Sequence, residues 1–199
     1  MTALNNISYG IFVLTAKDEK YNGCIINTLM QVTYSPNRIS ITVNKDNYTT
    51  KMIQKTGVFN VSILDSTTTF ETIKQFGFCS GKYTNKFENF NGYNIAENGV
   101  PYITKHCNSY ISAKVISTTD VGTHLIFVAD ITADQVLSQT ESATYSYYLN
   151  NIKPKPEKPK KRVYVCSICG YMHDSDTLPE DFICPLCKHG ASDFELLEY

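Results

Sequence analysis

The sequence has 199 residues with a formal net charge of -1, and 42% of them are hydrophobic, including 14 tyrosines and 10 phenylalanines. This is enough apolar material for a packed core, so the composition excludes a disordered chain. The longest apolar runs, GIFVL and HLIFVA, are too short for a membrane span of about 20 residues, and the first residues lack the basic region of a signal peptide. We therefore expect a cytoplasmic protein.

The first 150 residues are predicted to be mainly β. Runs rich in β-branched and aromatic residues predict strands over 7–15, 23–28, 38–44, 58–64, 110–118 and 123–136. Two short helices are expected, over 48–56 before Gly57 and over 69–76 before Gly77, because glycine commonly ends a helix. This pattern predicts an antiparallel barrel with short helices.

The charge changes sharply after this β-rich domain. Residues 1–150 hold 11 basic and 11 acidic side chains, residues 151–162 hold six basic and one acidic, and residues 163–199 hold one basic and seven acidic. The middle segment also contains Pro154, Pro156 and Pro159, which interrupt helices and sheet ladders and so predict an extended linker between two domains. Its lysines lack the interleaved aromatic residues that would favour nucleic-acid binding.

Two Cys-x-x-Cys pairs mark the C-terminal domain, 163–199, as a metal site. The predicted ligands are Cys166, Cys169, Cys184 and Cys187. Each pair in a tight turn points two sulfurs at one metal, and two such turns complete a tetrahedron. Four thiolates select zinc or iron, so the number of ligands leaves the metal open. A segment of fewer than 40 residues builds little core, so the metal must supply much of its folding free energy.

The residues around these ligands resemble rubredoxin, in Cys-x-x-Cys-Gly-Tyr at 166–171 and Pro-Glu-Asp-Phe-Ile-Cys-Pro-Leu-Cys at 179–187. The resemblance implies one iron and a small aromatic shield made of Tyr164, Tyr171, Phe182 and Phe194. The chain departs from the usual pattern in a short loop between the pairs, as in the rubredoxin-like tails of rubrerythrins. It also has Phe182 where tryptophan is frequent and Lys188 where glycine is usual. A zinc ribbon that stiffens the tail is the alternative.

The first domain resembles the flavin reductase family. The resemblance is carried, in the order typical of the family, by residues 22–33 before Ser35-Pro36, and by residues 44–49, 76–87 and 122–127. It implies an FMN-binding split β-barrel that usually dimerises. Such a barrel followed by a rubredoxin domain resembles the high molecular weight rubredoxins, which shuttle electrons from NAD(P)H to flavodiiron proteins that reduce nitric oxide or oxygen.

The same stretches contain polar groups suited to a flavin. For the pyrimidine edge, the candidates in a loop that leaves a strand are Asn27, Thr28, Gln31, Val32 and Thr33. For the phosphate, the candidates are Asn47 and Thr49 at a helix start, followed by Ser80, Gly81 and Lys86. Taken singly, Asn47 is also compatible with an N-cap, Gly81 with a turn and Lys86 with a solvated charge.

One histidine and three cysteines complete the candidates. His124 follows Gly122 and Thr123 in a Gly-x-His motif, which the resemblance places beside the flavin and the nicotinamide, although a lone strand histidine is also compatible with a structural role. The unpaired cysteines are expected to be buried small hydrophobes, and they are Cys24, Cys79 and Cys107.

These observations lead to one hypothesis and three alternatives. The hypothesis is a homodimeric NAD(P)H-dependent oxidoreductase in which FMN accepts a hydride and releases electrons singly to iron, which then serves a partner such as a flavodiiron protein. We expect no nucleic acid and no membrane as partners. The alternatives are a carrier that a separate reductase reduces, a zinc-ribbon flavin-binding protein without redox function, and a nucleic-acid binder that uses the linker lysines.

Overall fold

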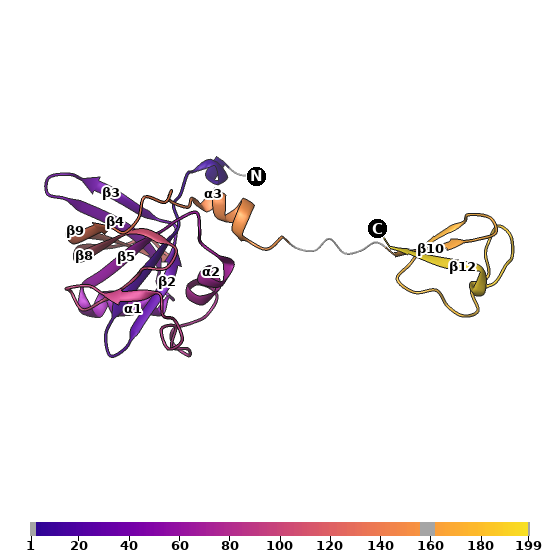
Figure 1. The fold of residues 1–199 in the computed structure, drawn as a ribbon, viewed down its shortest axis with the longest axis horizontal. Helices are drawn as coiled ribbons and strands as arrows, with labels where there is room; N and C mark the ends of the chain where they lie inside the picture. The colour runs from indigo at the N-terminus through magenta and orange to yellow at the C-terminus, as the bar shows by residue number, and fades with distance from the viewer. Residues whose placement is uncertain (1–2, 156–161, 199) are drawn as a thin grey trace. The chain divides into compact units, whose positions relative to one another are not determined.

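The computed structural model describes residues 3–155 and 162–198, which belong to two compact units (Figure 1). Unit 1 comprises Met1–Pro154 and unit 2 comprises Lys155–Tyr199. Residues 156–161, half of the predicted linker, lie outside the described residues. Every helix in the described part of the chain is too short or too polar to cross a bilayer.

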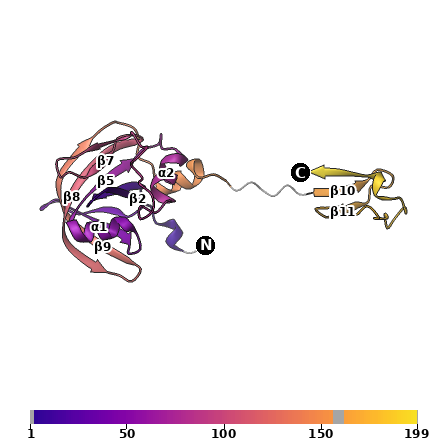
Figure 2. The same ribbon diagram turned by 90° about the horizontal axis from the view of Figure 1, so that it is seen from below.

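Unit 1 is built mainly from strands. Its elements are η1 (Ala3–Asn6), β1 (Phe12–Lys17), β2 (Tyr21–Ile26), β3 (Leu29–Thr33), β4 (Arg38–Asn44), α1 (Tyr48–Thr56), β5 (Val58–Leu64), α2 (Phe70–Gly77), β6 (Tyr93–Ile95), β7 (Pro101–Ile103), β8 (Cys107–Asp120), β9 (His124–Val136), α3 (Tyr145–Tyr147) and η2 (Tyr148–Ile152). Seven strands form one antiparallel sheet in the order β2-β1-β5-β8-β9-β4-β3. The sheet curls so that one face of these strands encloses the main core (Figure 2). The prediction of a mainly β split barrel is confirmed.

The two faces of the sheet carry separate cores. Alternation in β4 turns Ile39, Ile41 and Val43 inward, where they are almost fully buried. Helix α1 contributes to this main core, whereas α2 packs its apolar stripe into a second core on the other face of the sheet. As expected, α1 ends at Gly57, which has a φ of 71° and donates its N–H to the carbonyl of Ile53.

Strand β3 was predicted as a loop, and that prediction is wrong. Its residues pair with β4 from Leu29 to Thr33, with a bulge after Gln31, so the hairpin partner determines the structure of this segment. As the last strand of the sheet, β3 has a free edge. The outward side chain of Met30 is 67% exposed, and Val32 and Tyr34 are exposed on the same hairpin.

A buried ammonium group ties the segment 78–86, here called the 78–86 loop, to the barrel. Lys86 is only 2% exposed, and its Nζ donates hydrogen bonds of 2.8 Å to the carbonyls of Gly23 in β2 and Phe76 in α2. Burial lowers the pKa of Lys86. The interpretation of Lys86 as a solvated charge is therefore wrong.

A close contact between Gly81 and β2 holds the middle of the same loop. A Cβ atom at Gly81 would lie 1.9 Å from the Oδ1 atom of buried Asn22, so only glycine fits there. The Nζ atom of Lys20 donates a 2.8 Å hydrogen bond to the carbonyl of Gly81. The loop therefore has a defined position against β2.

The single cysteines differ in exposure. Cys24 and Cys107 are buried as expected, and burial raises the pKa of both thiols, that of Cys24 to about 11. Cys79 is exposed, so its predicted burial is wrong. It follows the end of α2 in the 78–86 loop, beside Phe78, which is also exposed.

Unit 2 is small and has almost no core. Its elements are β10 (Arg162–Cys166), β11 (Met172–Asp174), η3 (Ala191–Asp193) and β12 (Phe194–Glu198), and the sheet order is β11-β10-β12. The buried residues of its described part are Val163, Cys166 and Cys184. Phe182 packs edge-to-face against Phe194, with ring centroids 5.4 Å apart, and the ring of His173 lies 4.4 Å from Phe182. The sequence analysis did not include His173 in this aromatic group.

We predict that Lys86→Ala lowers the free energy of unfolding of unit 1 by about 2–4 kcal/mol, because it leaves two buried carbonyls without a donor and removes a buried alkyl chain. The matched control is Lys82→Ala in the same loop, whose exposed side chain should change stability by less than about 0.5 kcal/mol. Urea unfolding followed by circular dichroism measures both, and equal losses for the two variants would contradict the buried role of Lys86.

Candidate metal centre and flavin cleft

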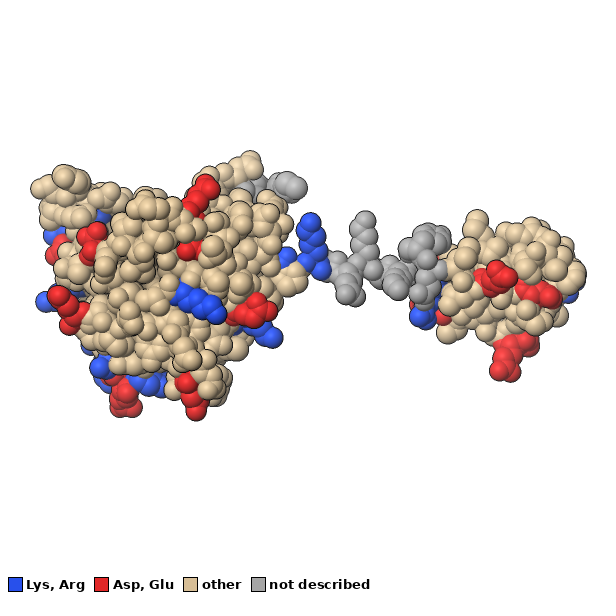
Figure 3. All heavy atoms as spheres, in the orientation of Figure 1, with Lys and Arg blue, Asp and Glu red and all other residues tan. Residues whose placement is uncertain are grey.

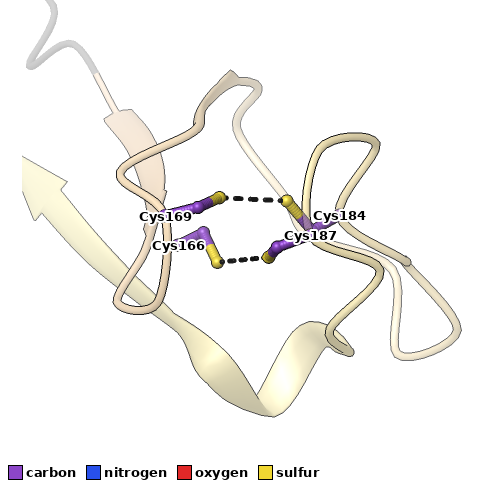
Figure 4. A group of neighbouring side chains, drawn as sticks. All are labelled: Cys166, Cys169, Cys184 and Cys187. Carbon is purple, nitrogen blue, oxygen red and sulfur yellow. Dashed lines mark hydrogen bonds between the residues drawn. The ribbon is translucent and has the colours of Figure 1, made fainter.

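The four predicted cysteine ligands converge on one point (Figure 4). Their Sγ atoms all lie within 4.8 Å of one another, and two separations are 3.6 Å, from Cys166 to Cys187, and 3.5 Å, from Cys169 to Cys184. A metal with about 2.3 Å bonds to four tetrahedral sulfurs separates them by about 3.8 Å. The cage therefore fits one tetrahedral metal ion.

Each Cys-x-x-Cys pair lies in a knuckle with the same backbone hydrogen bonds. In the first, the N–H of Gly170 donates to the carbonyl of Cys166 at 2.8 Å, and the N–H of Cys166 donates to Tyr171 at 2.9 Å. In the second, the N–H of Lys188 donates to Cys184 at 3.0 Å, and the N–H of Cys184 donates to His189 at 2.8 Å. The two halves of the cage are thus nearly equivalent.

Backbone N–H groups favour the thiolate form of the ligands. Although desolvation opposes it, the N–H groups of Cys187 and Leu186, together with the sulfurs of Cys187 and Cys169, lower the pKa of the Cys184 thiol to about 6. The sulfurs of Cys169 and Cys187 also accept backbone hydrogen bonds, from Tyr171 and His189 respectively, although desolvation and contacts with the neighbouring cysteine sulfurs raise the pKa of both thiols overall. Such donors stabilise the negative charge that the sulfurs carry when they bind a cation.

The cage is open on one side. Cys166 and Cys184 are buried, Cys187 is half-buried and Cys169 is exposed. The apolar side chains inside the two knuckles, Ile168 and Leu186, are 56% and 70% exposed. This edge of the cage is accessible to another redox centre.

We predict that Cys184→Ser abolishes stoichiometric metal binding and that unit 2 then loses its fold, because the ligands form most of its buried interior. The matched control Cys79→Ser, outside the cage, should retain one metal per chain. Elemental analysis gives the metal content, and hydrogen exchange at β10 and β12 reports the fold. Protected β10 amides in metal-free Cys184→Ser protein would contradict this prediction.

Two of the five candidates for the flavin ring line a cleft beside β3. Asn27 and Thr28 bound a cavity of about 180 Å³, together with residues 7–10, Leu29 and Met30 of β3, and Ser40 and Thr42 of β4. The hydroxyl of Thr28 donates a 2.7 Å hydrogen bond to the carbonyl of Thr42, which fixes this corner of the cleft. The other three candidates, Gln31, Val32 and Thr33, continue along β3, and Gln31 faces a different hollow of about 390 Å³ at the barrel mouth.

Two of the phosphate candidates, Asn47 and Thr49, lie at the N-terminus of α1. Asn47 occupies the N-cap position, yet its side chain makes no capping hydrogen bond, so the first N–H groups of the helix have no side-chain partner from it. The hydroxyl of Thr49 is fully buried and accepts a 2.9 Å hydrogen bond from Asn22 Nδ2. The N-terminus of a nine-residue helix attracts a phosphate through these N–H groups and the helix dipole.

The structure divides the phosphate candidates into two kinds. Ser80 is exposed and Gly81 lies next to Asn22, so this turn adjoins the same part of β2 that contacts Thr49. The ammonium of Lys86 is engaged by two carbonyls and positions the loop from inside. Asn22 was not predicted as a site residue, because its contacts are with Thr49 and Gly81, which lie 27 and 59 positions further along the chain.

His124 begins β9 and lies opposite Asn44, the last residue of β4 before the turn to α1. Its Nδ1 atom is 2.8 Å from the hydroxyl of Thr123, and the carbonyl of Thr123 accepts the N–H of Lys45. His124 is therefore half-buried near the turn that leads into α1. The polar cleft and the uncapped helix N-terminus fit a flavin with a terminal phosphate.

We predict that Asn47→Asp weakens FMN binding at least about tenfold, because a carboxylate at this helix N-terminus repels the phosphate. The apoprotein should keep or slightly raise its melting temperature, since aspartate is a favourable N-cap residue. Asn91→Asp, an exposed position outside the cleft, is the matched control. Fluorescence titration with FMN measures the affinity, and wild-type affinity in Asn47→Asp protein would exclude this phosphate position.

Comparisons with known proteins assign a family to each of the two units. The family model described as "Flavin reductase like domain" matches residues 4–154, and the one described as "Rubrerythrin, rubredoxin-like domain" matches residues 164–195. The high molecular weight rubredoxin of Moorella thermoacetica is 36% identical over 97% of each chain. The ferric-chelate reductase (NAD(P)H) of Archaeoglobus fulgidus is 38% identical over 73% of this chain and 86% of its own. The crystal structure of flavoredoxin from Methanosarcina acetivorans, 25% identical, covers 70% of this chain and 76% of its own with a TM-score of 0.61.

A flavin-reductase-like barrel and a four-cysteine centre in one chain define an oxidoreductase for flavin-linked electron transfer, with flavin and iron as its cofactors. Since the similarity to the Moorella protein extends through both units, the chain belongs to the high molecular weight rubredoxins.

Proposed function

We propose that this protein takes a hydride from NAD(P)H onto FMN in unit 1 and delivers the electrons singly to one iron in the Cys166, Cys169, Cys184 and Cys187 cage. The observation that carries the proposal is the presence in one chain of a cleft lined by Asn27 and Thr28, an uncapped helix N-terminus and a four-sulfur cage. The similarity to the Archaeoglobus ferric-chelate reductase (NAD(P)H) supports the choice of electron donor.

The two cofactors are both needed because their electron counts differ. A hydride carries two electrons and the iron centre takes one, and a bound flavin supplies the chemistry that converts one count into the other. In this proposal the α1 N-terminus holds the phosphate, and Asn27 and Thr28 orient the ring in the cleft. His124 contributes to the nicotinamide side of the same region.

The open edge of the cage is the proposed exit for electrons. Exposed Cys169 and its apolar neighbours Ile168 and Leu186 offer a short path to a partner. Acidic side chains dominate residues 163–199 and would steer a partner with a basic docking face (Figure 3). The proposed acceptor is a redox enzyme such as a flavodiiron nitric oxide or oxygen reductase.

The test is anaerobic rapid mixing of the full chain, loaded with FMN and iron, with NADH and separately with NADPH. We expect one of them to bleach the flavin absorbance first and the ferric thiolate absorbance afterwards. In Cys184→Ser protein, the flavin should bleach at the wild-type rate while the ferric thiolate band is absent.

Each alternative gives a different result in this test. Unchanged flavin and iron bands with both nucleotides would show that another protein reduces the flavin. Bleached flavin with a persistent ferric band would exclude transfer between the two centres. Zinc as the sole metal in protein from its native host would exclude the one-electron role altogether.

A further inference from the structure

The two knuckles of the cage differ at one equivalent position. After the second cysteine of the first pair stands Gly170, with a φ of 75°, and after that of the second pair stands Lys188, with a φ of 63°. Their N–H groups make the same hydrogen bond, to the carbonyl of the first cysteine of the pair. The backbone therefore demands the same left-handed conformation twice, and only one of the two residues is glycine.

A lysine at this position carries a conformational cost. The left-handed region brings the Cβ of an L residue close to its carbonyl oxygen, so glycine adopts it without this penalty. Lys188 is exposed, so packing of its side chain does not explain why lysine stands here instead of glycine. Within the described residues of unit 2, it forms no ion pair. When packing does not explain a residue in such a conformation, a functional reason for that residue is indicated.

The charge of Lys188 is also unusual for its surroundings. It is the single basic residue among residues 163–199, which hold seven acidic ones. Its Cα atom is one peptide, about 3.8 Å, from that of the ligand Cys187. The only lysine of an acidic domain thus stands next to the cage, at the position where glycine is favoured.

We propose that Lys188 is a nearby positive charge that raises the reduction potential of the iron centre, an inference that rests on the proposed function. In the step concerned, ferric iron takes one electron from the flavin and becomes ferrous, while all four iron–sulfur bonds persist. The charge of the unit of iron and four thiolates changes from -1 to -2. A nearby positive charge stabilises the second state more than the first, so it favours reduction. Lys188 acts only through its positive charge and forms no bond to the iron or to the sulfurs.

The test compares four forms of the full chain loaded with iron and FMN: wild type, Lys188→Gln, Lys188→Gly and Lys188→Arg. Spectroelectrochemical titration of the ferric thiolate band gives the potential of each. At low ionic strength, we expect the ratio of ferrous to ferric protein at a fixed applied potential to fall about two- to five-fold in the glutamine and glycine variants. That change corresponds to about 20–40 mV for one electron. The arginine variant should match the wild type.

Two further readouts separate charge from backbone conformation. Because salt screens exposed charges, the differences in potential should shrink at 1 M salt, where the screening length is about 3 Å. Lys188→Gly should melt at a higher temperature than Lys188→Gln, since only glycine relieves the strained φ. Lys105→Gln, an exposed lysine in unit 1, controls for the change in net charge and should leave the potential unchanged.

The outcomes distinguish this inference from the function on which it rests. Wild-type potential in Lys188→Gln protein that holds ferric iron would overturn the inference alone. A shift in Lys188→Gly protein without one in Lys188→Gln protein would assign the effect to the backbone and also overturn it. A chain that holds only zinc would overturn the proposed function, and the inference with it.

Discussion

The convergence of four sulfurs on one cation is the interaction on which unit 2 depends. Its described part buries only one side chain besides two of the ligands, so the small aromatic group around Phe182 is too little apolar core to hold β10, β11 and β12 together. The N–H groups that point at the sulfurs stabilise thiolate charge and at the same time define the turns. Folding and redox chemistry therefore rely on the same few contacts.

Unit 1 is organised in the opposite way. Its apolar side chains form two cores, and its unusual features are buried polar groups such as Lys86 and Asn22. Lys86 and Asn22 connect the 78–86 loop and α1 to β2, so the position of the proposed phosphate site depends on buried hydrogen bonds. In unit 1, the few buried hydrogen bonds of Lys86 and Asn22 therefore determine the position of the proposed phosphate site.

The sequence was most informative where structure is set by local patterns. Strand β4 and helix α1 have the predicted bounds because alternation and a terminal glycine are visible within a few residues. The four ligands were equally clear from their spacing. The strand nature of β3 and the burial of Lys86 were not predictable in this way, since each depends on a distant partner, and the positive φ of Lys188 became visible only in the folded knuckle.

The free edge of β3 has a consequence for the handling of the barrel alone. An edge strand offers unpaired N–H and C=O groups to any other strand, and most proteins protect such edges with charged residues. Here the outward residues near the tip are Met30, Val32 and Tyr34, none of which is charged. Unit 1 produced at high concentration is thus prone to edge-to-edge association through this hairpin, and new lysines on its outer face would reduce it.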